Sequence, residues 1–256
     1  MKYTNRHLYG QHFLSDLTII SRIIQIAEIN NNTKVLEIGT GRGGLTKLIA
    51  QRAAYVQTVE IDRELFSRAK FVLDRFDNVE VVQKDILNMN DSGFDIIISS
   101  LPYNISTRFV EWLSGQGCLR AVIVLQTDFA EKLFQKPGTK KYNSVSVLSQ
   151  FCFNVSREGL IPRTSFEPPP RVDSCIVKFE RKVSLLDWRY VSKDLKYLFS
   201  FRGKMVRTVF KKLHLLYPAL SIPSFVKETR RIEEMSPDDF MQILAYMRLG
   251  RNVSTQ

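Results

Sequence analysis

Four adjacent residues, Ser100, Leu101, Pro102 and Tyr103, have the composition of a pocket for a flat aromatic base. They follow the apolar run 94–99, which predicts a strand, and therefore lie at its C-terminal end. The serine hydroxyl and the proline carbonyl can accept hydrogen bonds from an exocyclic amino group, and Tyr103 can stack on the ring. Stacking contributes about 1–3 kcal/mol per base, comparable to the few kcal/mol that extruding a base requires. Such a tetrad is more often an ordinary turn, so its meaning depends on the motifs around it.

A glycine loop lies upstream of this tetrad. Gly39, Gly41 and Gly44 follow a short β run at 34–38 and precede a helical segment at 45–50. Glycines let the backbone approach a ligand closely, and the N-terminus of the following helix is electrically positive. The spacing alone is weak, because dinucleotide-binding domains and methyltransferases share it.

Carboxylates end the next two predicted strands. Glu60, followed by Ile61, ends the run 55–62, about 20 residues after the glycine loop, where a carboxylate can accept both ribose hydroxyls of an adenosine. Asp85 and Ile86 follow the third predicted strand, where the carboxylate can accept the adenine amino group and Ile86 can pack on the ring. Each acid alone could be a solvated strand end. The glycine loop and two acids at successive strand ends together predict a nucleoside cofactor.

The fourth strand separates two enzyme classes that share these features. A dehydrogenase needs a proton donor or acceptor near the carbinol, yet His7, His12 and His214 do not stand at predicted strand ends. The tetrad instead suits methyl transfer to an adenine N6 from S-adenosylmethionine. Acceptors at Ser100 and Pro102 would hold the N6 hydrogens and direct the nitrogen lone pair at the methyl group. This displacement requires no metal.

The alternation of strands and helices predicts an α/β fold with a doubly wound parallel sheet, whose ligand lies at the C-terminal edge of the strands. A helix capped by Ser15 or Asp16 is expected at 16–29, and another at 129–134. The expected strands are 34–38, 55–62, 79–83, 94–99, 120–126, 151–155 and 174–179.

The composition of the chain limits which classes of partner it can bind. The net charge of +11 and a pI near 9.6 predict a polyanionic partner, nucleic acid before membrane, although a basic surface that serves only solubility is the simpler alternative. Three widely spaced cysteines, Cys118, Cys152 and Cys175, predict neither a disulfide framework nor a metal site. No segment approaches the roughly 20 apolar residues that span a bilayer, so we expect a cytoplasmic protein.

Beyond about residue 182 the sequence becomes helical and basic, which predicts a first domain at 1–182 and a helical domain at 183–256. The stretch 199–213 carries the basic residues expected to contact RNA phosphates: Arg202, Lys204, Arg207, Lys211 and Lys212. At helical spacing Lys204, Arg207 and Lys211 would share one face. A solvated basic helix is the alternative interpretation.

Taken together, these motifs resemble those of the small-subunit ribosomal RNA adenine dimethyltransferase family, nearly from end to end. The matching segments are 10–14, 36–41, 59–62, 101–107, 136–147, 166–174 and 201–207. The two longest and most specific are Gly-Gln-His-Phe-Leu at 10–14 and Phe-Glu-Pro-Pro-Pro-Arg-Val-Asp-Ser at 166–174. The resemblance implies a Rossmann-like class I methyltransferase domain with a seven-stranded, mostly parallel sheet, and a small all-α C-terminal domain.

The resemblance also implies the site and its partners. The target adenine would lie between Tyr103 and Phe166, and the chain would act as a monomer on small-subunit rRNA or the pre-ribosomal small subunit, dimethylating two adjacent adenosines near the 3′ end. It implies cofactor contacts at His12, Leu14, Gly39, Glu60, Asp85 and Ser100.

The chain departs from the family pattern at two positions. Thr40 stands where the family has proline, which should only loosen the glycine loop. Ser100 stands where the family has asparagine, so that one hydroxyl replaces a carboxamide. Two alternatives remain: a macrolide-resistance type of methyltransferase that acts on large-subunit rRNA, and a ribosome-assembly factor with weak or no methylation.

Overall fold

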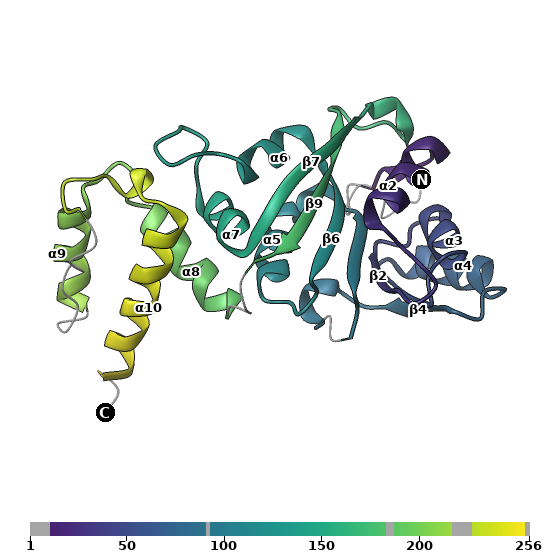
Figure 1. Ribbon diagram of the computed structural model, residues 1–256, viewed down its shortest axis with the longest axis horizontal. Coiled ribbons are helices and arrows are strands. Elements are labelled where there is room, and N and C mark those ends of the chain that lie inside the picture. The colour runs from purple at the N-terminus through teal and green to yellow at the C-terminus, as the bar shows by residue number, and fades with distance from the viewer. Residues whose placement is uncertain (1–10, 91–92, 183–186, 217–226, 254–256) are drawn as a thin grey trace, which may run out of the picture.

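The computed structural model describes residues 11–90, 93–182, 187–216 and 227–253. Its main sheet contains β2 (Lys34–Ile38), β3 (Tyr55–Glu60), β4 (Val79–Gln83), β5 (Ile96–Ser100), β6 (Arg120–Gln126), β7 (Phe153–Ile161) and β9 (Ser174–Arg181). The spatial order is β4-β3-β2-β5-β6-β9-β7 (Figure 1). Neighbours pair in parallel except that β9 runs antiparallel to both β6 and β7. The predicted seven-stranded, mostly parallel sheet is confirmed.

Helices follow the strands in alternation. Among the described residues before β7, the helices are α2 (Leu17–Ala27), α3 (Gly44–Ala50), α4 (Arg63–Leu73), α5 (Ser106–Ser114), α6 (Thr127–Leu133) and α7 (Ser144–Cys152). Short 3-10 turns are η1 (Ile86–Asn88), η2 (Tyr103–Ile105) and η3 (Arg163–Ser165). Asp16 is the N-cap of α2, because its carboxylate accepts hydrogen bonds from the backbone N–H of Thr18 and Ile19.

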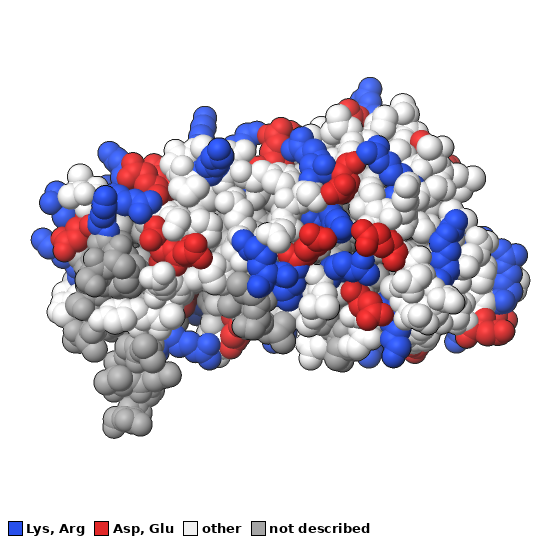
Figure 2. Space-filling view, in the orientation of Figure 1, with Lys and Arg blue, Asp and Glu red and all other residues white. Residues whose placement is uncertain are grey.

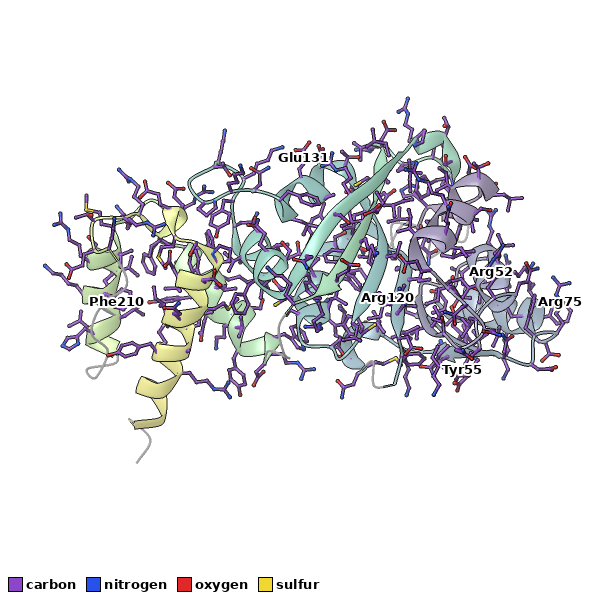
Figure 3. The ribbon with its side chains drawn as sticks, viewed as in Figure 1. Arg52, Tyr55, Arg75, Arg120, Glu131 and Phe210 are labelled. Atoms are coloured by element: carbon purple, nitrogen blue, oxygen red, sulfur yellow. The ribbon has the colours of Figure 1, made fainter. Side chains whose placement is uncertain are left out.

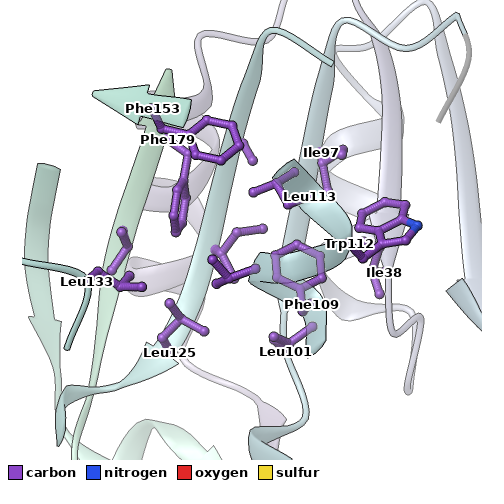
Figure 4. Packing of buried hydrophobic residues seen from close by; sticks show 14 of the residues in the cluster. Ile38, Ile97, Leu101, Phe109, Trp112, Leu113, Leu125, Leu133, Phe153 and Phe179 are labelled. Atoms are coloured by element: carbon purple, nitrogen blue, oxygen red, sulfur yellow. The ribbon is translucent and has the colours of Figure 1, made fainter. Parts of the chain in front are cut away.

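Alternating side chains of the strands form two hydrophobic layers, one on each face of the sheet. Ile96 and Ile98 of β5 lie in the layer covered by α2 and α3, and Ile97 lies in the layer covered by α5, α6 and α7. Phe109 and Trp112 of α5 are fully buried in the second layer (Figure 4). The hydrophobic effect therefore fixes the register of β5, and with it the position of the tetrad that follows.

The structure differs from the sequence-based expectation in two places: one local prediction was wrong, and one small sheet was not predicted. Phe151 and Cys152 end helix α7 and do not begin a strand, because Asn143 caps that helix through a capping box and its periodicity continues to Cys152. The second difference is a small antiparallel sheet that pairs β1 (Phe13–Leu14) with β8 (Phe166–Glu167). Elements of two residues leave no periodic signal in a sequence.

The C-terminal helices α8 (Trp188–Phe199), α9 (Val206–Leu216) and α10 (Pro237–Val253), with the turn η4 (Ile232–Glu234), lie together beyond α7 (Figure 1). They enclose a third core in which Phe210 of α9 lies between α9 and α10 (Figure 3). Tyr142, which precedes α7, is fully buried in this core and donates its hydroxyl to the Met235 carbonyl at 3.0 Å. The helical part thus shares a core with the preceding part.

The predicted boundary at 183 lies in the segment 183–186, outside the described residues. The predicted helical stretch 199–213 is interrupted, because α8 ends at Phe199 and a turn separates it from α9. In the parts of the chain that the structure describes, no helix has the length and apolarity to cross a membrane.

A buried polar cluster lies beneath the glycine loop. Glu37 of β2 is 1% exposed and accepts a hydrogen bond from Thr46 Oγ1 of α3 at 2.6 Å. Thr40 of the loop bonds the hydroxyl of Thr58 in β3 at 2.7 Å. The Thr40 hydroxyl thus ties the loop to β3, a contact that the expectation of a looser loop did not include.

Glu37 should make stability depend on pH. Burial raises the pKa of Glu37 from 4.5 to about 7, against weaker opposing hydrogen bonds from Thr46 and Thr58. Between these two pH values the folded chain keeps a proton on Glu37 that the unfolded chain has released. The stability that this proton contributes is therefore complete below pH 4.5 and is lost as the pH rises through 7. We therefore compare the unfolding free energy of Glu37→Gln with that of the native chain by urea denaturation. The difference, variant minus native, should increase by about 3 kcal/mol between pH 4.5 and pH 8.

The matched control is Glu64→Gln, at an exposed position in the first turn of α4. Its difference from native should stay within about 0.5 kcal/mol across the same range. A pH-independent difference for Glu37→Gln would show that Glu37 is ionised in the folded chain.

Candidate active site

A cavity of about 490 Å³ opens at the C-terminal edge of β2, β3 and β5. Its walls come from the N-terminal segment, the glycine loop and the residues that follow β3, β4 and β5. The candidate residues that line it are His12, Leu14, Gly39, Gly41, Glu60, Ile61, Asp85, Ile86, Ser100, Leu101, Pro102 and Tyr103. Residues from distant parts of the sequence thus meet in one cavity, as expected at the carboxyl edge of a parallel sheet.

The glycine loop has a backbone that only glycine adopts easily. Gly39, Gly41 and Gly43 have φ angles of 82°, 53° and 75°. A Cβ at Gly41 would lie 2.9 Å from the Phe13 ring, so the loop fits closely under the N-terminal segment. A Cβ at Gly39 would point toward the Ser100 carbonyl at 3.9 Å. Both glycines line the cavity without a side chain, which suits a ligand that must approach the backbone closely.

Glu60 is a buried carboxylate that holds the loop. One oxygen accepts the Gly41 N–H at 2.9 Å and the other accepts the Asp62 N–H at 3.0 Å. Burial raises the pKa of Glu60, while these two backbone hydrogen bonds oppose the rise. Each carboxylate oxygen retains a further lone pair, so the side chain can support the loop and accept a ligand hydroxyl together.

The next strand end carries Asp85 and Ile86. The Asp85 carboxylate caps η1, accepting the Leu87 N–H at 3.0 Å, while the residue remains partly exposed in the cavity wall. Ile86 is 4% exposed and supplies apolar surface beside it. Ile61, at 46% exposure, lines the same region from the end of β3. An acceptor between apolar side chains is suited to the edge and faces of an adenine ring.

The tetrad combines core and pocket residues. Leu101 is 2% exposed and belongs to the core, which anchors its neighbours. Ser100 and Pro102 are partly exposed to the cavity. The Pro102 carbonyl accepts the Ile105 N–H at 3.2 Å, so its second lone pair is the one available to a ligand.

Both the hydroxyl and the ring of Tyr103 contact other side chains. Its hydroxyl lies 2.7 Å from Ser174 Oγ of β9, and its ring stacks on His12 with centroids 5.6 Å apart. Burial raises the pKa of Tyr103, which keeps the phenol neutral. Ser174 is a positioning residue that the sequence interpretation did not single out, although it ends the long motif at 166–174.

Phe166 does not face Tyr103 across the cavity. Its side chain is 3% exposed and packs in the core layer beneath α2, and the residue is absent from the cavity wall. The expectation of a Tyr103–Phe166 sandwich is corrected for this arrangement, because pairing of β8 with β1 places Phe166 opposite Leu14. The ring that lies against Tyr103 is His12.

The N-terminal segment is held across the cavity by several contacts. His12 Nδ1 lies 2.8 Å from the Pro168 carbonyl. Arg42 of the glycine loop pairs with Glu167 at 2.5 Å and lies 4.8 Å from the centre of the Phe13 ring. Arg42 and Phe13 lie within segments that the sequence analysis used, but neither was singled out, because the partners of Arg42 come from distant parts of the chain.

The basic residues of the C-terminal part have different roles. Arg202 is structural: its guanidinium pairs with Glu233 at 2.7 Å and donates to the carbonyls of Thr139 and Lys140. Lys204 lies in the turn before α9 and not on a helix, so it does not share a helix face with Arg207.

Arg207 and Lys211 are exposed four residues apart on α9. Lys212 lies 5.2 Å from the centre of the Phe201 ring. Figure 2 shows Lys and Arg side chains, interspersed with acids, gathered at the end of the molecule where α9 lies. This surface remains a candidate for phosphate contacts, without Arg202.

The chain was compared with known proteins. The family model described as Ribosomal RNA adenine dimethylase matches residues 2–249. A protein of Streptococcus pneumoniae (strain CGSP14) named Ribosomal RNA small subunit methyltransferase A is 36% identical over 218 aligned residues, covering 79% of this chain and 75% of the relative.

Two solved structures are similar over nearly the whole chain. A dimethyladenosine transferase from Plasmodium falciparum is 26% identical, with a TM-score of 0.76, covering 94% of this chain and 98% of its own. The 23S rRNA methyltransferase ErmE is 24% identical, with a TM-score of 0.63, covering 92% of this chain and 99% of its own, and indicates the fold alone. The family model and the relatives agree with the motifs that line the cavity, and the chain therefore belongs to the ribosomal RNA adenine dimethylase family of methyltransferases.

Proposed function

We propose that this chain transfers methyl groups from S-adenosylmethionine to N6 of adenine in small-subunit rRNA, and that it dimethylates two adjacent adenosines near the 3′ end. The observation that carries the proposal is the convergence, in one cavity, of the glycine loop, two strand-end acids and the tetrad 100–103. The name of the Streptococcus pneumoniae relative favours the small subunit over the large subunit. We further propose that the chain acts as a monomer in the cytoplasm.

The cofactor half of the cavity would be formed by the loop and the acids. Gly39 and Gly41 would let backbone approach the ligand, Glu60 would accept ribose hydroxyls, and Asp85 would accept the adenine amino group. His12 and Leu14 would cover this ligand from the N-terminal segment. S-adenosylmethionine supplies an electrophilic methyl group when bound.

The target half would be formed by the tetrad. Tyr103 would stack on the flipped adenine, while Ser100 Oγ and the Pro102 carbonyl would accept hydrogen bonds from N6. These acceptors orient the nitrogen lone pair and favour the positive charge that develops on N6 as its bond to the methyl carbon forms and the methyl–sulfur bond breaks. S-adenosylhomocysteine is the leaving group, and N6 then releases one proton to water. Because serine is shorter than the asparagine of the family pattern, a water molecule could complete the Ser100 contact.

Glu60→Ala should weaken S-adenosylmethionine binding by about 2–3 kcal/mol, since it removes charged acceptors for hydroxyl groups. Isothermal calorimetry measures this change. The carboxylate also holds the Gly41 and Asp62 N–H groups, so thermal unfolding is recorded in parallel, and Glu60→Gln, which keeps one acceptor oxygen, should lose less affinity. Unchanged affinity in a folded Glu60→Ala variant would rule out the ribose assignment.

Tyr103→Ala should lower kcat for rRNA methylation at least tenfold and leave cofactor affinity unchanged, because stacking positions the acceptor and not the donor. The assay is mass spectrometry of nucleosides from small-subunit rRNA, in which the native chain should form N6,N6-dimethyladenosine. Tyr103→Phe keeps the ring, loses only the Ser174 contact and should keep most of the rate. Equal loss of rate and cofactor affinity in Tyr103→Ala would contradict the stacking role, and binding of the subunit without methylation would favour an assembly factor.

Neutralising Lys204, Arg207 and Lys211 together should flatten the log–log salt dependence of rRNA binding by about 2, since each lost contact to a single strand removes about 0.7. Affinity for S-adenosylmethionine should not change. Arg202→Ala is the contrasting variant: it should lower thermal stability, because its guanidinium joins the loop 139–140 to η4, and leave the salt slope unchanged. An unchanged slope in the triple variant would exclude this surface from RNA binding.

A further inference from the structure

The cavity has three basic side chains in its wall, and they differ in how they are engaged. They are Arg42, Lys84 and Arg108. Arg42 is already paired with Glu167 and lies over Phe13. Lys84 directly precedes Asp85 on the side of the cavity assigned to the cofactor. Arg108 belongs to α5, which directly follows the turn formed by Tyr103, Asn104 and Ile105, and these three residues line the cavity as well.

The guanidinium group of Arg108 has no partner among the residues that the structure describes. Its side chain is exposed, and no hydrogen bond or ion pair links it to another described residue. It is the third residue of α5, a helix with no acid in its first turn and no side-chain cap. A cation near a helix N-terminus is disfavoured because the helix dipole is positive there.

The helix that carries Arg108 is rigidly placed. Phe109 and Trp112 of α5 are fully buried in the core, and Glu111 pairs with Lys196 of α8 at 2.7 Å. The backbone of Arg108 is thus fixed relative to Tyr103, which lies only five residues earlier and lines the same cavity. A locally unfavourable charge held on a rigid element beside a binding pocket is typical of a ligand-binding position.

The ligand expected there is an anion that accompanies a flat base. A nucleotide whose base stacks on Tyr103 brings its flanking phosphates to the mouth of the cavity, and an arginine fork matches phosphate oxygens in a bidentate manner. We propose that Arg108 binds a phosphate that flanks the target adenosine and thereby holds the flipped nucleotide in the pocket. The proposal rests on the proposed function, because it takes a base on Tyr103 as its starting point.

Arg108→Gln tests this proposal, since glutamine keeps a polar side chain but removes the charge. We expect KM for an rRNA oligonucleotide containing the target to rise about tenfold, with the S-adenosylmethionine dissociation constant unchanged within twofold. Arg108→Lys should recover part of the loss. The matched control is Arg63→Gln, an exposed arginine at the start of α4 that lies outside the cavity wall, and its KM should equal that of the native chain.

Oligonucleotides with one uncharged methylphosphonate linkage locate the contact. This linkage is moved along the strand one position at a time. When it replaces a phosphate next to the target adenosine, the native chain should bind the oligonucleotide about tenfold more weakly. Binding by Arg108→Gln should not weaken further at that position. Equal sensitivity of both proteins to every linkage position would overturn the proposal.

Binding measured by fluorescence anisotropy keeps this result separate from the proposed function. If the native chain methylates no adenosine in the oligonucleotide, the proposed function fails. The same titrations still decide the role of Arg108, because equal dissociation constants for native, Arg108→Gln and Arg63→Gln proteins would show that Arg108 contacts no phosphate.

Discussion

The glycine loop between β2 and α3 depends on hydrogen bonds from buried side chains of the neighbouring strand. Glu60 accepts the Gly41 N–H, and Thr58 bonds the hydroxyl of Thr40. A loop with positive φ angles at three glycines has high conformational entropy when unconstrained, so these buried contacts are what keep its backbone in one arrangement.

Burial strengthens those hydrogen bonds, but it also makes any buried polar group without a partner costly. An unpaired polar group in the interior costs about 1–3 kcal/mol, so Glu37 and Glu60 must either find partners or remain protonated. Glu60 has two backbone donors, whereas one Glu37 oxygen has no hydrogen-bond partner among the described residues. Glu60 lines the cavity and holds the loop, whereas Glu37 lies in the core and holds Thr46 of α3.

The cavity is closed by a segment that is distant in sequence from the sheet. Pairing of β1 with β8 and the stack of His12 on Tyr103 place the N-terminal segment against the tetrad. On the far side, Tyr142 and Arg202 join the C-terminal helices to the loop before α7. The helices therefore present their basic side chains from a fixed position relative to the cavity, as the proposed RNA-binding role of this surface requires.

Much of the fold and the site follows from local sequence patterns. The seven strands, the Asp16 cap and the strand-end positions of Glu60, Asp85 and Ser100 could be predicted, because periodicity and turn chemistry act over a few residues. The residues that follow one strand can be identified from local sequence, and parallel pairing places the C-terminal ends of these strands on one edge of the sheet.

Contacts between distant residues required the tertiary structure. Arg202 looks like a phosphate ligand in sequence, but Glu233 and two loop carbonyls occupy its guanidinium. Phe166 looks like the partner of Tyr103, yet pairing of β8 with β1 buries it in the core. Thr40 ties the loop to β3 because Thr58 lies within 2.7 Å. A residue type specifies what a side chain can do, but only the neighbours supplied by the fold decide which of its possible partners it meets.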